Sequence, residues 1–180
     1  MDSTTTYVFI AGIGNSEPEH WQSLWRGRAA KGVWVEHGSW NNPIRDVWVK
    51  EFDDTLKSIE GPKILIAHSL GCTLVTEWAS EYGDDAIVGS FLVSMPDVHG
   101  ENFPAQAVGF GAPRPVRLPF RTVVVASEDD PYGSLESSSA GAEKLGARLV
   151  NVGRKGHINL NSGLGDWPEG WAIFSTEFAS

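Results

Sequence analysis

The sequence predicts an α/β protein: a three-layer sandwich with a mostly parallel central sheet of about six strands and helices on both faces. Short apolar runs rich in β-branched residues alternate along the chain with longer stretches whose apolar residues recur at helical spacing. The short runs are apolar on both sides, as strands buried between two layers of helices are. No repeat, low-complexity tract or change in composition divides the 180 residues, so we expect one domain over 1–180.

The first elements of the chain alternate between strand and helix. Tyr7–Ala11 is an apolar run that predicts the first strand, and Pro18 opens a helix to about Ala30 because proline is favoured in a first helical turn. Val33–Val35 predicts a short second strand. Pro43 then introduces a helix whose apolar residues recur as far as Ile59, where Gly61-Pro62 follows to end it.

The rest of the chain continues the alternation. Lys63–Ala67 is a β-branched apolar run, and the apolar residues after Ser69 recur at helical spacing. Ser134 is a typical N-cap for a helix to about Leu145, and Pro168 opens a last helix to about Phe178. Three more apolar runs predict strands at 86–94, 122–126 and 148–152. Residues 96–120 are rich in Pro and Gly without periodicity, and loops of that length are often functional.

Composition excludes several classes of protein. The net charge is −9 and the 14 Lys and Arg residues are scattered, whereas a nucleic-acid surface needs clustered cations, so we expect no nucleic-acid partner. No apolar stretch approaches ~20 residues, and the N-terminal residues lack the features of a secretory signal, so we expect no membrane association. Cys72 is the only cysteine, which excludes an internal disulfide and fits a reducing, cytoplasmic location. The oligomeric state is not predicted.

Neither a metal nor a cofactor is expected. The five histidines and the single cysteine lack the spacing of metal ligands. Gly12-x-Gly14 is similar to the start of a dinucleotide-binding loop, but Glu17 stands where the third glycine is required.

Residues 67–71, Ala-His-Ser-Leu-Gly, lie between a predicted buried strand and a predicted helix. A serine on so sharp a turn has small neighbours because the backbone there is crowded. The usual pattern is G-x-S-x-G, the nucleophile elbow of α/β-hydrolases, and here Ala67 replaces the first glycine. On its own this string is a weak signal.

Polar residues at three strand ends strengthen that signal. The ligand sites of open α/β sheets lie beyond the carboxyl ends of the strands. Ser69 follows one predicted strand, residues 127–131 (Ser-Glu-Asp-Asp-Pro) follow a second, and residues 156–159 (Gly-His-Ile-Asn) follow a third. A serine, an acid and a histidine therefore occur in the chain order of an α/β-hydrolase triad.

Four stretches of the chain resemble one family, the small serine hydrolases related to retinoblastoma-binding protein 9 and the bacterial YdeN-type proteins. The resemblance covers nearly the whole chain. The stretches are GIGNSEPEHW (12–21), AHSLG (67–71), SEDDPY (127–132) and GHINLNSGLGDWPEG (156–170). The resemblance implies a compact α/β-hydrolase fold without a large cap domain, a Ser-Asp-His triad, and hydrolysis of carboxylic esters.

Each member of the expected triad has a chemical role. Ser69 is the candidate nucleophile and His157 the base that accepts its proton and later protonates the leaving group. Asp129 and Asp130 compete to orient the imidazole, and adjacent side chains on an extended segment point in opposite directions. Asp130 precedes Pro131, which favours an extended backbone, and it matches the acid-before-proline position of the family. We therefore predict Asp130, with Asp129 as a solvated turn residue.

Other residues are candidates to bind the substrate. The backbone N–H groups of Leu70, just after the nucleophile, and Ile13, in the loop after the first strand, are the expected oxyanion donors. His20 and Trp21 either line the pocket or pack the first helix. Met95 and Pro96, after a strand end, are candidate contacts for the acyl group. The side chain of His68 should diverge from Ser69, so we assign it no direct role.

The leading functional hypothesis is a cofactor-free serine hydrolase that cleaves small carboxylic esters or thioesters through an acyl-enzyme intermediate. The alternative is a protein-interaction module on a hydrolase scaffold, because the named relative binds a partner through an L-x-C-x-E motif. The corresponding residues 70–74 carry Leu74 where Glu is required, so that partner is not implied. Acyl transfer to an acceptor other than water would use the same triad.

Overall fold

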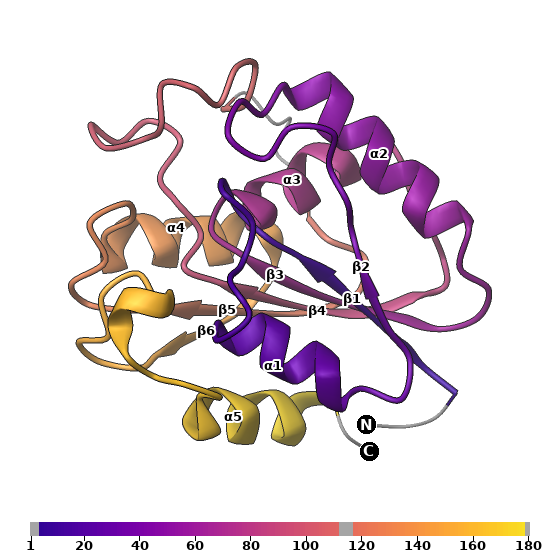
Figure 1. Ribbon diagram of the computed structural model, residues 1–180. Coiled ribbons are helices and arrows are strands. Elements are labelled where there is room, and N and C mark those ends of the chain that lie inside the picture. The colour runs from indigo at the N-terminus through magenta and orange to yellow at the C-terminus, as the bar shows by residue number, and fades with distance from the viewer. Residues whose placement is uncertain (1–3, 112–116, 179–180) are drawn as a thin grey trace.

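The computed structural model describes residues 4–111 and 117–178, and within them a single six-stranded sheet forms the centre of the molecule (Figure 1). All neighbouring strands are parallel, in the order β2-β1-β3-β4-β5-β6. The strands are β1 (Thr6–Ile10), β2 (Gly32–Trp34), β3 (Lys63–His68), β4 (Ile87–Val93), β5 (Arg121–Ala126) and β6 (Arg148–Asn151). The predicted fold class is confirmed.

Five α-helices cover the two faces of the sheet in the described residues. They are α1 (Trp21–Arg28), α2 (Arg45–Lys57), α3 (Leu70–Ala79), α4 (Leu135–Leu145) and α5 (Pro168–Phe178). Helices α2, α3 and α4 lie on one face, and α1 and α5 lie on the other (Figure 1). None of these helices has the length and apolar character needed to cross a membrane.

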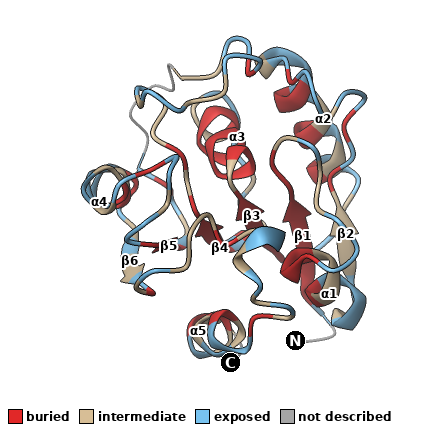
Figure 2. Ribbon diagram, turned by 60° about the vertical axis from the view of Figure 1, so that its left-hand side comes forward, coloured by how far each residue is buried: buried red, intermediate tan, exposed pale blue. Residues whose placement is uncertain are grey.

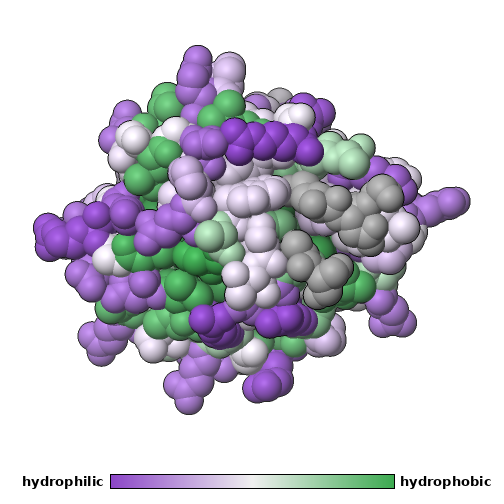
Figure 3. All heavy atoms as spheres, turned by 90° about the horizontal axis from the view of Figure 1, so that it is seen from below, coloured by the Kyte–Doolittle hydropathy of each residue, from purple (hydrophilic) through white to green (hydrophobic). Residues whose placement is uncertain are grey.

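Successive side chains of a strand pack alternately into two separate hydrophobic cores, one on each face of the sheet. In β1, Val8 and Ile10 belong to the core under α2, α3 and α4, whereas Tyr7 and Phe9 belong to the core under α1 and α5. This alternation follows from the two-residue period of a strand, and it explains why the strands are apolar on both sides. Figure 2 shows the buried strands between the two layers, and Figure 3 shows polar side chains projecting around the edge of the outer face of α1 and α5.

The strand order places a crevice between β1 and β3. Because β2 lies on one side of β1 and β3 on the other, the connections leaving β1 and β3 run to opposite sides at their carboxyl ends. Gly71 allows α3 to start directly against the end of β1, since a Cβ there would lie 2.4 Å from the carbonyl oxygen of Ile10. The residues after β1 and β3 are therefore neighbours.

The first two helices begin later than the sequence predicts, whereas α5 begins at Pro168 as predicted. The first helix begins at Trp21 and not at Pro18, because the Nδ1 atom of His20 accepts the backbone N–H of Gln22 and caps the helix there. The second helix likewise begins two residues after Pro43. Ser134 caps α4 as expected, through the N–H of Ser137.

The segment predicted as a long loop, 96–120, lies partly outside the described residues, at 112–116. Its described part is attached to the start of α2 by a parallel bridge between Ile44 and Val108. The N–H of Arg45 donates to the carbonyl of Val108 over 2.9 Å. The described part of this loop therefore has a defined place at the carboxyl edge of the sheet, where Pro104 and Gln106 line a cavity.

Candidate active site

Ser69 occupies a strained turn between β3 and α3. Its backbone has φ 55° and ψ −127°, in the positive-φ region that a residue with a Cβ seldom adopts. Gly12, in the loop after β1, permits this turn because a Cβ at that position would lie 2.8 Å from the Cβ of Ser69. The small residues that the turn requires are thus Gly12 and Gly71, and Ala67 fits without strain as a fully buried residue of β3.

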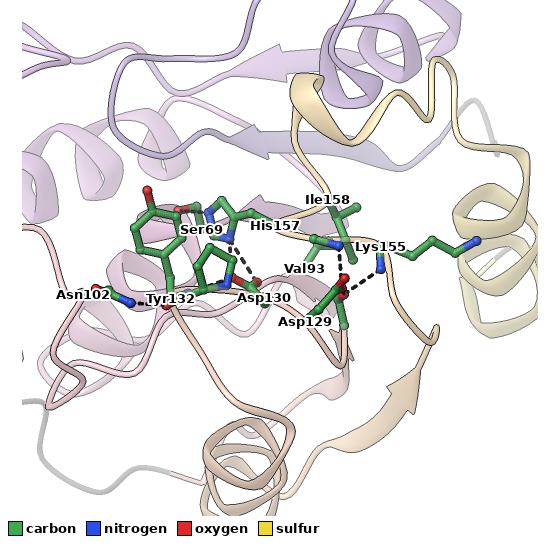
Figure 4. Close-up of polar contacts among 12 residues, drawn as sticks. Ser69, Val93, Asn102, Asp129, Asp130, Tyr132, Lys155, His157 and Ile158 are labelled. Atoms are coloured by element: carbon green, nitrogen blue, oxygen red, sulfur yellow. Dashed lines mark hydrogen bonds and ion pairs between the residues drawn. The ribbon is translucent and has the colours of Figure 1, made fainter.

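A continuous chain of polar contacts joins Ser69, His157 and Asp130 (Figure 4). The Oγ atom of Ser69 lies 2.8 Å from Nε2 of His157, and Nδ1 of the same ring lies 2.9 Å from both carboxylate oxygens of Asp130. The tautomer with its proton on Nδ1 donates to Asp130 and leaves Nε2 free to accept the serine proton. The three side chains come from the ends of β3, β5 and β6, and little of Asp130 (3%) or His157 (10%) is exposed.

Asp129 points away from the imidazole (Figure 4). Its Oδ1 atom accepts the backbone N–H of Gly156 at 2.8 Å and the hydroxyl of Ser127 at 2.9 Å. The bond from Gly156, with that from Ser127, lowers the pKa of the Asp129 carboxyl. Asp129 is an exposed turn residue, as expected, and in addition it binds the segment that carries His157.

The two expected oxyanion donors face the same cavity. Gly14 N–H donates to the Trp40 carbonyl and Asn15 N–H to the Gly12 carbonyl, so the loop after β1 folds into a turn. The N–H groups of Ile13 and Leu70 have no acceptor among the residues that the structure describes. Both residues line the cavity beside Ser69, where free N–H groups could receive an oxyanion.

The cavity beside Ser69 has a volume of about 260 Å³ and lies at the carboxyl ends of the strands. Among the described residues of its wall, Glu17 is the one Asp or Glu, and none is Lys or Arg. Its lining residues are Gly12, Ile13, Asn15, Glu17, His20, His68, Ser69, Leu70, Pro96, Pro104, Gln106, Tyr132, His157, Asn159, Leu160 and Asn161.

Comparison with known proteins agrees with this geometry. Residues 7–176 match the family described as "Serine hydrolase". The chain belongs to the serine hydrolase family.

Solved structures of several hydrolases share the fold of this chain. A YdeN-like hydrolase of Pectobacterium atrosepticum is 28% identical, with a TM-score of 0.84 over 97% of this chain and 90% of that one. The ydeN gene product of B. subtilis is 20% identical, with a TM-score of 0.79 over 98% and 100%. The RedJ thioesterase of Streptomyces coelicolor shares the fold at 15% identity, with a TM-score of 0.73 over 98% and 88%. A search of curated protein sequences found no match.

The three residues proposed from the sequence to contact substrate have different places in this serine hydrolase. His20 lines the cavity, and its burial lowers the pKa of the imidazole to about 4, so the ring is neutral. Trp21 is 2% exposed and does not line the cavity, and its Nε1 donates to the carbonyl of Ile158 over 2.9 Å. Pro96 lines the cavity, but Met95, the other candidate acyl contact, does not, and its side chain packs against Gly141 of α4. The expectations for Trp21 and Met95 as substrate contacts therefore do not match the structure.

Two residues near His157 were not assigned a role from the sequence. The Nε2 atom of His68 lies 2.9 Å from the carbonyl oxygen of His157, and the ring of Tyr132 lies 4.6 Å from the imidazole of His157, centroid to centroid. Burial holds the pKa of His68 well below its ordinary value, so His68 is a neutral donor. The signals in the sequence were that His68 precedes Ser69, that Tyr132 follows Asp130 by two residues, and that both lie in stretches that resemble the family.

Cys72 is a packed thiol of α3. Its Sγ atom lies 3.3 Å from the carbonyl oxygen of Val93, and burial raises the pKa of the thiol. Among the described residues, no group of three or more His, Cys, Asp or Glu side chains is placed to hold a metal ion.

Proposed function

We propose that this protein hydrolyses small carboxylic esters or thioesters through an acyl-enzyme formed on Ser69. The chain of contacts from Ser69 through His157 to Asp130 carries the proposal. A serine hydroxyl is too weakly acidic to attack a carbonyl unless an adjacent base accepts its proton, and Nε2 of His157 lies within hydrogen-bond distance of that hydroxyl.

The reaction follows from this arrangement in two halves. Ser69 Oγ bonds to the acyl carbon while its proton passes to His157, and the N–H groups of Leu70 and Ile13 bind the oxyanion. The C–O or C–S bond to the leaving group then breaks, and His157 returns the proton to that group. In the second half water attacks the acyl carbon and loses a proton to His157. The bond between that carbon and Ser69 Oγ then breaks as His157 passes the proton to Oγ, and the acid leaves. Asp130 stabilises the imidazolium in both halves.

The cavity limits the substrate in size and charge. Its volume of about 260 Å³ is below the ~300–1,000 Å³ of sites that enclose drug-sized ligands, so a short acyl group fits best. The carboxylate of Glu17 has no ion pair among the described residues, and the described part of the wall has no Lys or Arg to bind an anionic group. We therefore expect uncharged acyl groups to be preferred over those that carry a carboxylate.

Two measurements test this proposal: labelling by an activity-based probe, and turnover of a series of p-nitrophenyl esters. A fluorophosphonate probe should label the protein, and turnover should be fastest for short acyl chains. Ser69→Ala should abolish both, whereas Ser80→Ala, at the opposite end of α3, should alter neither by more than about twofold. Unchanged labelling of Ser69→Ala, or no turnover of any ester, would refute the proposal.

The structure provides no support for the alternative of a binding module through residues 70–74. Leu70, Cys72 and Leu74 are each no more than 1% exposed within α3 and its core. A partner could reach these side chains only if α3 left the sheet. Acyl transfer to an acceptor other than water shares every step up to the acyl-enzyme, and analysis of the products separates it from hydrolysis.

A further inference from the structure

The backbone of residues 155–158, which carries the candidate base, is held at four successive positions by side chains from other segments. On one side, the N–H of Lys155 donates to the hydroxyl of Ser127 and the N–H of Gly156 donates to Oδ1 of Asp129, each over 2.8 Å. Ser127 and Asp129 are themselves joined by a hydrogen bond of 2.9 Å. The first half of the segment is thus attached to the end of β5.

On the other side, two ring N–H groups bind the next two carbonyls. His68 Nε2 donates to the carbonyl of His157, and Trp21 Nε1 donates to the carbonyl of Ile158, each over 2.9 Å. Both donors are at least 95% buried. A carbonyl can only accept, so these bonds fix the proton of His68 on Nε2.

The segment needs this restraint because its backbone is strained. Ile158 is fully buried and has φ +49°, a region that β-branched residues avoid. Gly156 has a positive φ as well, of 59°, which a glycine adopts without strain. Strained backbone persists only where surrounding contacts over-determine it.

Two adjacent residues of the turn after β3, His68 and Ser69, both form hydrogen bonds to His157. Ser69 Oγ meets the imidazole at Nε2 over 2.8 Å, and the preceding residue, His68, holds the backbone carbonyl of the same histidine. We propose that His68 and Trp21 are positioning residues that hold the imidazole of His157 in line with Ser69, an inference that rests on the proposed hydrolase function. Because His68 and Ser69 are adjacent, any displacement of the end of β3 moves nucleophile and base together.

A matched pair of tryptophan variants separates positioning from stability. Trp21→Phe removes the bond to Ile158, whereas Trp25→Phe removes an equivalent bond of 2.8 Å from the same helix to the carbonyl of Asp166. Both should lower the melting temperature by similar amounts. Trp21→Phe should reduce kcat about tenfold or more at unchanged KM, because small misplacements of catalytic groups are costly. Trp25→Phe should leave kcat within about twofold.

Two substitutions of His68 test the second donor. The amide nitrogen of a glutamine can occupy the place of imidazole Nε2, whereas that of an asparagine falls near Nδ1 and does not reach the His157 carbonyl. His68→Gln should therefore keep kcat within about threefold, and His68→Asn should lose about tenfold or more at unchanged KM. The NMR signal of the Nδ1 proton of His157, which reports its bond to Asp130, should persist in His68→Gln and Trp25→Phe and broaden or shift in His68→Asn and Trp21→Phe.

Equal kcat losses in Trp21→Phe and Trp25→Phe, or equal activity in His68→Asn and His68→Gln, would overturn the positioning role. A failure of the proposed function is distinguishable, because wild-type protein would then show neither labelling nor turnover. The NMR signal of His157 would in that case still report whether the two donors orient its ring.

Discussion

Nδ1 of His157 lies at the same distance, 2.9 Å, from both carboxylate oxygens of Asp130, while the adjacent Asp129 makes no contact with the ring. Two neighbouring carboxylates thus have separate tasks. One binds the imidazole, and the other binds the backbone one residue before it. Their separation gives a direct test of the triad.

Asp130→Asn should reduce kcat by about 10³–10⁴-fold, because an amide nitrogen beside Nδ1 favours the wrong imidazole tautomer. Asp129→Asn should cost less than about tenfold, since its amide oxygen can still accept the N–H of Gly156. Steady-state kinetics on one p-nitrophenyl ester gives both values. Equal losses in the two variants would show that Asp130 is not the orienting acid.

Gly12→Ala should reduce activity at least a hundredfold and lower stability by about 1–3 kcal/mol, because the new methyl group would lie 2.8 Å from the Cβ of Ser69. Gly27→Ala is the matched control, in α1 with no neighbouring atom within 4 Å of the added Cβ. The control should gain about 0.5–1 kcal/mol from helix propensity and keep full activity. Urea unfolding and ester turnover measure both effects, and a fully active Gly12→Ala would contradict the close approach.

Acid should destabilise the folded protein through His20. Its imidazole titrates near 6.5 when unfolded and at about 4 when folded, because burial disfavours the charged ring. The unfolded chain therefore binds more protons as pH falls from 6.5 toward 4, and stability declines over that window. Between pH 7 and pH 5, protonation of His20 in the unfolded chain should lower the free energy of unfolding by about 2 kcal/mol.

His20→Asn should remove this contribution of about 2 kcal/mol to the loss of unfolding free energy between pH 7 and pH 5. The asparagine oxygen can replace Nδ1 as the acceptor for Gln22 N–H, so the cap of α1 is kept while the titrating ring is lost. Urea unfolding at pH 7 and pH 5 should show a smaller loss for the variant than for the wild type. Identical losses in the two proteins would assign the acid sensitivity to other groups.

Glu17→Gln should raise the ratio of kcat/KM for a carboxylate-bearing ester to that for a neutral ester of equal size, by about two- to fivefold. The reason is the loss of an unpaired negative charge from the cavity wall. Glu19→Gln, close in the sequence but outside the cavity wall, should leave the ratio unchanged. The gain should shrink in high salt, and a gain of equal size in Glu19→Gln would point to the net charge of the protein instead.

The strands and most helix boundaries could be predicted because they depend on local periodicity. Apolar runs of β3 and β5 and the N-cap Ser134 act within a few residues, and the structure has them where the pattern indicated. The order Ser69, Asp130, His157 was likewise visible, because parallel strands bring their carboxyl ends to one edge. The helix start at Trp21 was missed because the capping atom belongs to a histidine, which is not a usual N-cap.

Apolar periodicity was sufficient for the α/β class, and the residues at strand ends were sufficient to propose Ser69 as nucleophile and His157 as base, since both depend on spacing along the chain. The tasks of Asp129, His68 and Trp21 depend on contacts between residues 27, 89 and 137 positions apart. Such contacts form only when the strands pair and their carboxyl ends come to one edge of the sheet, and no local sequence pattern encodes them. Only the tertiary structure brings Asp129, His68 and Trp21 into contact with the backbone segment that carries the imidazole of His157.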